Sequence, residues 1–349
     1  MNDEMTIVYN VAHEAPLGPL IAVYFYMTGL SAGSFILSTL AYGFGIKRFK
    51  PLGKIGVVLA TVLLVLAPIN LIADLGQPWR FWHLFPYLNP TSPITYGSFL
   101  LTLYPVNCLI YAFFMFKGDD RMTKLFGLIG IPLAVSVHGY TGFIMALAKA
   151  RALWNTALMP VLFLVSAMVS GIALMILVVT VVGFLSKQRR PDPTLIRDLG
   201  RILVGAILLD LFLVFSDVLV LLTSDSEAAE AATTILRGAF SQYFLGVEIL
   251  SGSLVPLLLL TAPTALLARF ATAFAPPILG ATLVYVGAVP MLPLGLPVMA
   301  ASFIPLLVQG IPQRHRPLPA AVAASVLVMA GILAMRYVVV IGGQYAPLS

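Results

Sequence analysis

The chain alternates between long apolar segments and short polar connections. Eight apolar runs of roughly 20 to 28 residues carry very few charged side chains, and this is the length of a helix that crosses a bilayer. The strands of a membrane barrel would instead give alternating segments of about 10 residues. We therefore predict an all-α, polytopic transmembrane helix bundle. The predicted spans are Leu17–Gly45, Lys54–Ala73, Ile94–Phe116, Met122–Leu147, Leu158–Leu185, Ile202–Thr223, Ala239–Leu260 and Leu318–Ile341.

A further apolar stretch, residues 263–312, is interrupted by prolines such as Pro276, Pro290 and Pro297. It is too long for a loop and too broken for one clean span, so we predict a hairpin of two short helices. The count is then eight spans, or ten if the hairpin crosses the membrane twice. We expect one integral membrane domain over residues 1–349, with a seven-helix core (1–262), the hairpin (263–312), and a final helix with a short outer tail (313–349).

Composition agrees with this pattern. Apolar residues make up 60% of the 349 residues and charged residues 10%, which is unsuited to a soluble domain and makes membrane lipid the main surrounding. The net charge of +6 does not indicate nucleic-acid binding, because the cations form short clusters between spans rather than a stripe.

The cation clusters predict the orientation of the chain in the membrane. Most of them fall in alternate connections, and such connections face the cytoplasm. These cytoplasmic cations are Lys47, Arg48, Lys50, Lys54, Lys117, Arg121, Lys124, Lys187, Arg189, Arg190, Arg197, Arg201, Arg269, Arg314 and Arg316. The opposite connections hold fewer cations and more acids. Both termini are therefore predicted on the outer side, which requires an even number of spans.

Charged or titratable side chains at membrane depth are costly, so each is a candidate functional residue. They are Asp74, His138, Tyr140, Asp210, Asp217, Glu248 and Arg336. Asp210 and Asp217 are seven residues apart and therefore share one helix face. Structural roles are equally open: Arg336 could pair with Asp217 or Glu248 to hold the bundle together, and His138 could be an interhelical contact. Because most of these residues lie at middle or outer depth, we predict a pocket or a proton route in the outer half.

Metal centres within the chain are not expected. A membrane b-type haem needs two histidines at matched depth, and of the four histidines only His138 has a plausible depth. Cys108 is the single cysteine, whereas an iron–sulfur cluster needs about four thiolates. We predict no haem, no iron–sulfur cluster and no metal site, so metal centres for a redox role would belong to another subunit.

Several strings resemble a known family. They are Gly29-Leu30-Ser31-Ala32-Gly33-Ser34, Asp74-Leu75-Gly76-Gln77-Pro78-Trp79-Arg80 leading to Pro90-Thr91-Ser92-Pro93, Tyr140-Thr141-Gly142-Phe143 with Leu153-Trp154-Asn155-Thr156, and Arg336-Tyr337-Val338-Val339-Val340-Ile341-Gly342-Gly343-Gln344. Together they resemble the NrfD/PsrC family, the membrane subunits of polysulfide reductase and related molybdopterin complexes. The order of the strings is specific to the family rather than to one complex.

The resemblance implies a haem-free quinone or quinol site near the outer face. Its expected residues are His13, Asp74 and Tyr140, with Arg80 as a further quinone contact and His138 as a further catalytic candidate. The expected ligand is menaquinone or ubiquinone. A four-cluster iron–sulfur subunit would dock on the outer face, together with a molybdopterin or multihaem catalytic subunit. The expected location is the cytoplasmic membrane of a bacterium or archaeon.

On this interpretation the chain exchanges electrons between the quinone pool and the docked iron–sulfur subunit. Tyr140 or His13 would hold a quinone oxygen, and Asp74 would take up a proton. Asp210, Asp217, Glu248 and Arg336 would extend a proton path toward the membrane middle. The main alternative is a secondary transporter with a polar site at the midplane, and a passive membrane anchor is a third.

Overall fold

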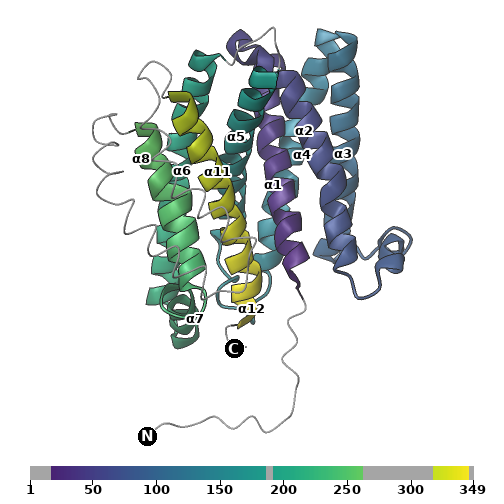
Figure 1. Ribbon diagram of the computed structural model, residues 1–349. Coiled ribbons are helices and arrows are strands. Elements are labelled where there is room, and N and C mark those ends of the chain that lie inside the picture. Colours follow the sequence, from purple (N-terminus) through teal and green to yellow (C-terminus); the bar gives the residue numbers. More distant parts are fainter. Residues whose placement is uncertain (1–16, 186–191, 262–316, 346–349) are drawn as a thin grey trace, which may run out of the picture.

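A computed structural model describes residues 17–185, 192–261 and 317–345 (Figure 1). In these residues all the regular secondary structure is helical, which confirms the predicted all-α class. The elements are α1 (Pro19–Tyr42), η1 (Lys47–Phe49), α2 (Lys50–Ala73), η2 (Pro78–Leu84), α3 (Pro93–Lys117), α4 (Asp120–Ala146), α5 (Met159–Leu185), α6 (Pro193–Thr223), α7 (Ser226–Leu236), η3 (Gln242–Leu254), α8 (Val255–Thr261), α11 (Pro317–Tyr337), η5 (Val338–Gly342) and α12 (Gly343–Tyr345).

Among the described residues, 8 helical segments are long and apolar enough to cross a membrane. The first six are α1 to α6, the second of which also includes η1. The seventh consists of η3 and α8, and the eighth of α11, η5 and α12. They correspond one for one to the eight predicted spans. The predicted hairpin over residues 263–312 lies outside the described residues.

The helix α1 begins, and α12 ends, at the same end of the bundle, which also carries η2 and α7 (Figure 1). This arrangement agrees with an even number of spans. The sequence predicts that this end faces outward, and we refer to it as the outer end.

The sixth span is longer than the hydropathy pattern predicted. The helix α6 begins at Pro193 rather than near Ile202, because Asp192 caps it and proline suits a first helical position. Hydrogen bonds from the Thr194 hydroxyl and backbone N–H lower the pKa of Asp192. The added turns carry Asp198, which forms an ion pair with Arg48 between α1 and α2. The charged turns thus extend the helix beyond its apolar part.

The short helix α7 was not predicted. It has 11 residues and lies at the outer end, between α6 and η3. The side chain of Asp225 caps it by accepting a hydrogen bond from the backbone N–H of Ala228. A hydropathy scan overlooks such a helix because it is too short to cross a bilayer.

The helix α1 is central to the bundle and contacts α2, α4, α5 and α11. Its approach to α5 is close at Gly33, where an added Cβ would lie 2.6 Å from the Ala167 carbonyl oxygen and 2.7 Å from the Gly171 Cα. A second close crossing joins α11 to η3, where a Cβ on Gly331 would lie 2.5 Å from the Gly252 Cα. Small residues at such crossings let membrane helices pack backbone to backbone.

Candidate functional site

The candidate residues Asp74 and Tyr140 lie beside the outer part of α1. Asp74 follows the last residue of α2, and its Oδ2 accepts a hydrogen bond of 3.0 Å from the backbone N–H of Gly18. A Cβ at position 18 would collide with the Asp74 Oδ1, so a side chain there would displace the carboxylate from its present position. The carboxylate is half-buried at the N-terminal end of α1, where a helix favours negative charge. The fold therefore holds one acid at the outer end, between α1 and α2.

Tyr140 approaches α1 from a different side. Its ring end packs against Gly97 near the start of α3, where only a glycine leaves room for the phenol. It also lies close enough to Tyr24 of α1 for the two phenols to interact electrostatically. Tyr24 is six positions beyond Gly18, a rise of about 9 Å along the helix. The Tyr140 hydroxyl is left without a hydrogen-bond partner among the described residues, so it is free to donate to a ligand.

His138 faces the interior of the bundle, away from Tyr140. The two residues are two positions apart on α4, which places their side chains on nearly opposite faces. His138 is fully buried, and its Nε2 would lie 3.0 Å from a Cβ on Gly29 of α1. Neither ring nitrogen has a hydrogen-bond partner within the described part of the chain. His138 is thus an α1 contact deeper in the core than Tyr140.

The remaining predicted quinone contacts are placed differently. Arg80 is exposed in η2, on the connection between α2 and α3 at the outer end. The same connection exposes large aromatic side chains, among them Trp79, Trp82 and Tyr87. His13 lies outside the described residues. Within the described residues no hydrogen bond or ion pair joins Arg80 to Asp74, and the assignments of Arg80 and His13 stay predictions.

Arg336 is buried completely inside the bundle. Its Nη2 donates to the Phe163 carbonyl oxygen at 3.1 Å and to the Ser166 hydroxyl at 2.6 Å, and its guanidinium lies 3.8 Å from the Phe163 ring centroid. A cation held over an aromatic face gains electrostatic energy. Asp210 and Glu248 interact with Arg336 electrostatically. Neither is within ion-pair distance, so the predicted pairing with Asp217 or Glu248 is not how the described residues hold this cation.

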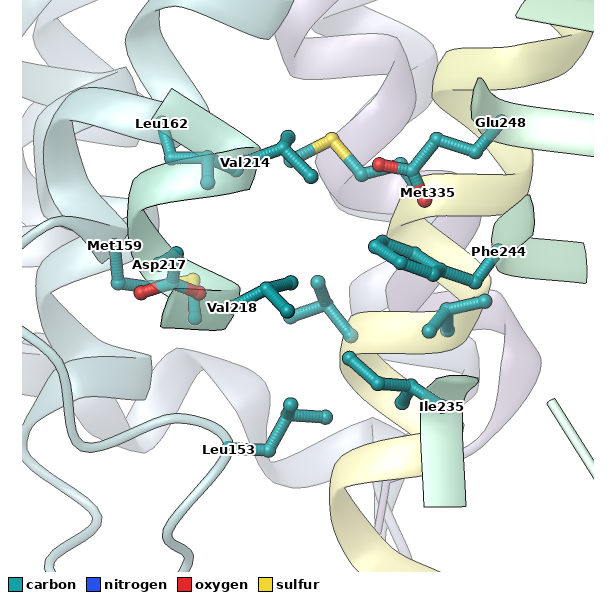
Figure 2. Close-up of a pocket in the computed structure, with 12 residues that line it drawn as sticks. Leu153, Met159, Leu162, Val214, Asp217, Val218, Ile235, Phe244, Glu248 and Met335 are labelled. Atoms are coloured by element: carbon teal, nitrogen blue, oxygen red, sulfur yellow. The ribbon is translucent and has the colours of Figure 1, made fainter. Parts of the chain in front are cut away.

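Asp217 and Glu248 line one pocket between α5, α6, η3 and the last span (Figure 2). Its empty volume is about 410 Å³ including the mouth, but it is narrow, with room for water rather than for a quinone ring. Buried polar atoms without partners lie in the same region, including Asp217 Oδ1 and the Nε and Nη1 of Arg336. The other lining residues are mostly apolar. The predicted proton-path residues are thus gathered in one region.

Two of the elements that line this pocket, η3 and η5, are π-helical. Glu248 lies within η3, and η5 begins two residues after Arg336. Wide turns of this kind are rare and frequently mark functional sites. They cannot be recognised from hydrophobic periodicity.

One feature of the outer end was missed in the sequence. Gln344, in α12, accepts a hydrogen bond of 3.0 Å from the Leu17 backbone N–H and donates one of 2.9 Å to the Leu17 carbonyl. Arg151 donates to the Gln344 carbonyl at 2.8 Å, and the Trp154 indole donates to the Val339 carbonyl at 2.6 Å. Gln344 and Leu17 are 327 positions apart, so no local sequence signal could have joined them.

The chain is similar to known membrane proteins over much of its length. A family model described as "Polysulphide reductase, NrfD" matches residues 8–291. The chain is 31% identical over 242 residues to a subunit of the selenate reductase of Mesobacillus selenatarsenatis, which covers 58% of this chain and 56% of that protein. It is 34% identical over 195 residues to the Hdr-like menaquinol oxidoreductase integral membrane subunit of Archaeoglobus fulgidus, covering 56% and 49%.

A further relative is aligned over more of its length. It is one of the polypeptides of the polysulfide reductase of Wolinella succinogenes, 29% identical over 248 residues, which covers 65% of this chain and 77% of that protein. The matches to the selenate reductase and menaquinol oxidoreductase subunits span about half the length of those proteins.

Proposed function

The chain belongs to the NrfD family, a family of multi-pass membrane subunits of reductase and oxidoreductase complexes, and we propose that it exchanges electrons between the membrane quinone pool and a docked iron–sulfur subunit. The observation that carries the proposal is the half-buried Asp74 carboxylate, fixed by the Gly18 N–H at the outer end between α1 and α2. The name of the Archaeoglobus relative, a menaquinol oxidoreductase subunit, supports a quinone as the redox partner.

The residues beside α1 fit the head group of a quinone. A bound quinone would supply two-electron, two-proton redox chemistry. Tyr140 offers a hydroxyl donor to a carbonyl oxygen, and Asp74 keeps Oδ1 available to accept a proton while Oδ2 stays bonded to Gly18. Gly18, which holds Asp74, and Tyr24, which lies near Tyr140, are separated by a rise of about 9 Å along α1, and we propose that one ligand contacts both side chains. Either menaquinone or ubiquinone satisfies this chemistry.

The proposed partner would supply the metal centres. With Cys108 as its single cysteine, the chain has too few thiolates to hold an iron–sulfur cluster alone. We therefore assign the electron acceptor or donor to a four-cluster iron–sulfur subunit on the outer face, joined to a molybdopterin or multihaem catalytic subunit. The name of the Mesobacillus relative, a selenate reductase subunit, supports assembly into a reductase complex. The proposed location is the cytoplasmic membrane of a bacterium or archaeon.

A test is gentle purification from the native membrane, followed by mass spectrometry of subunits and extraction of bound quinones. Recovery with a cysteine-rich, ferredoxin-like subunit and with quinone is the expected result. Recovery of the chain alone, free of quinone and active in solute uptake, would instead favour the secondary transporter.

The pocket between Asp217 and Glu248 supports a second role, a proton route linked to the quinone reaction. The unpaired Asp217 Oδ1 in its lining is the kind of atom that ordered water satisfies, and carboxylates at that depth are able to exchange protons. We expect Glu248→Gln to abolish quinol-driven proton uptake in proteoliposomes while quinol turnover changes less than about 10-fold. Proton movement is read with a pH-sensitive dye and turnover by quinol absorbance. Unchanged proton uptake in this variant would rule out Glu248 as a member of the route.

A further inference from the structure

The end of the last span is tied to Asp74 through a single peptide group. Gln344 Nε2 donates to the carbonyl oxygen of Leu17, and the N–H on the other side of that same peptide bond, that of Gly18, donates to Asp74 Oδ2. Hydrogen bonds arranged in such a chain polarise one another. The two distances are 2.9 Å and 3.0 Å, which are normal for N–H···O bonds.

The Gln344 side chain is well suited to hold this peptide. Its Oε1 accepts from the Leu17 N–H while its Nε2 donates to the Leu17 carbonyl, so both polar groups of one residue are held at once. A second donation from Nε2, to the Val340 carbonyl at 2.8 Å, fixes the amide to its own segment. Gln344 is only 5% exposed, so water competes little for these bonds.

The backbone around Gln344 is itself braced from the connection between α4 and α5. Arg151 donates to the Gln344 carbonyl, and Trp154 donates to the Val339 carbonyl one turn earlier. Gly343 is required beside Trp154, because any side chain would collide with the indole. These hydrogen bonds hold the backbone that carries the Gln344 side chain. A displacement of the Gln344 amide would therefore also move the Leu17–Gly18 peptide to which it is bonded.

We propose that Gln344 is a positioning residue for Asp74, acting through the Leu17–Gly18 peptide to fix the carboxylate at the outer end of α1. This inference rests on the proposed function for its consequence in turnover, but the structural link is testable without it. Gln344 touches no part of the proposed ligand site itself. It sets where the Gly18 N–H points and therefore where Asp74 Oδ2 is held.

The test compares Gln344→Met with Gln242→Met in the intact complex. Methionine matches glutamine in length and removes both polar atoms, and Gln242 is an exposed glutamine at the outer end. Amide hydrogen exchange is read at single-residue level at Leu17 and Gly18, which are flanked by Pro16 and Pro19 and so stand apart from other amides. We expect Gln344→Met to speed exchange at both amides and Gln242→Met to change neither.

Exchange at Gly18 is the decisive signal, because that amide donates to Asp74 and not to Gln344. Faster exchange at Leu17 alone would show that Gln344 only holds the chain end, and would overturn the proposal. We further expect Gln344→Met to lower quinone-linked turnover on the order of 10- to 100-fold, as small misplacements of a reacting group do. In an Asp74→Asn background the same change should cost nothing more, whereas independent effects would multiply.

These readouts separate the two proposals. If Gly18 exchange responds to Gln344→Met while Asp74→Asn retains full turnover, the positioning link stands and the assignment of Asp74 fails. If Asp74→Asn abolishes turnover while Gln344→Met leaves both exchange and turnover unchanged, the proposed function stands and the role of Gln344 is refuted.

Discussion

Replacement of Asp74 by asparagine is expected to lower quinone-linked turnover of the assembled complex by about 100-fold or more, the usual contribution of a proton-transferring side chain. The amide oxygen of asparagine is still able to accept the Gly18 N–H, so the outer end of α1 keeps its anchor. The variant therefore removes the proton acceptor with little change of structure. Turnover is measured with a quinol analogue, and assembly by size-exclusion chromatography of the complex.

A matched control uses the same substitution at Asp225, which caps α7 at the outer end and lies outside the proposed site. Asparagine caps helices as well as aspartate, so Asp225→Asn should assemble and turn over normally. Tyr140→Phe, which removes only the hydroxyl donor, should resemble Asp74→Asn rather than the control. Normal turnover in an assembled complex carrying Asp74→Asn would show that the site has been placed on the wrong residues.

The sequence predicted the spans well because lipid imposes a strong rule on them. Every backbone polar group inside the bilayer needs a partner within the protein, so each crossing appears as one long apolar run. The start of α6 was misplaced because Arg197 and Arg201 interrupt that run, although the helix itself continues through them. The rule concerns lipid contact, and it does not detect helical turns that extend beyond the lipid.

The candidate site residues were predicted from the free-energy cost of placing a charged group in the membrane, and not from contacts between residues. A charged group at membrane depth is expensive, and this argument selected Asp210, Glu248 and Arg336, all three of which are buried in the structure. It could not identify their partners: Arg336 is held by Ser166 and a backbone carbonyl of α5, which carry no sequence signal. The opposite orientation of His138 and Tyr140 could have been predicted, because two residues that are two positions apart on a helix point in nearly opposite directions.

Gln344 illustrates the limit most clearly. It belongs to a string that resembles the family, yet nothing in its neighbourhood indicates a role. Its partner Leu17 lies at the other end of the chain, and the contact exists only because α1 and the last span are side by side in the fold. Long-range hydrogen bonds to backbone atoms are independent of the partner's side chain, so no residue pattern records them.

The glycines of the string from Gly29 to Ser34 have a packing explanation that leads to a stability prediction. Gly33 and Gly171 meet where α1 crosses α5, and an added Cβ on Gly171 would collide with the backbone of Gly33. Backbone cannot move aside as a flexible side chain does, so Gly171→Ala is expected to destabilise the protein by about 1–3 kcal/mol. The measurement is thermal unfolding in detergent, and the expected result is a clear fall in the unfolding temperature.

Gly205 provides the opposite expectation on a neighbouring helix. A Cβ added there meets nothing within 4 Å, so Gly205→Ala removes a flexible residue from the interior of α6 without a collision. Alanine is favoured over glycine in a helix interior by about 0.5–1 kcal/mol, and this variant should unfold at the same or a higher temperature. A rise for Gly205→Ala with a fall for Gly171→Ala would locate the effect in the crossing. Equal shifts in both variants would contradict a close approach of α1 and α5 at this crossing.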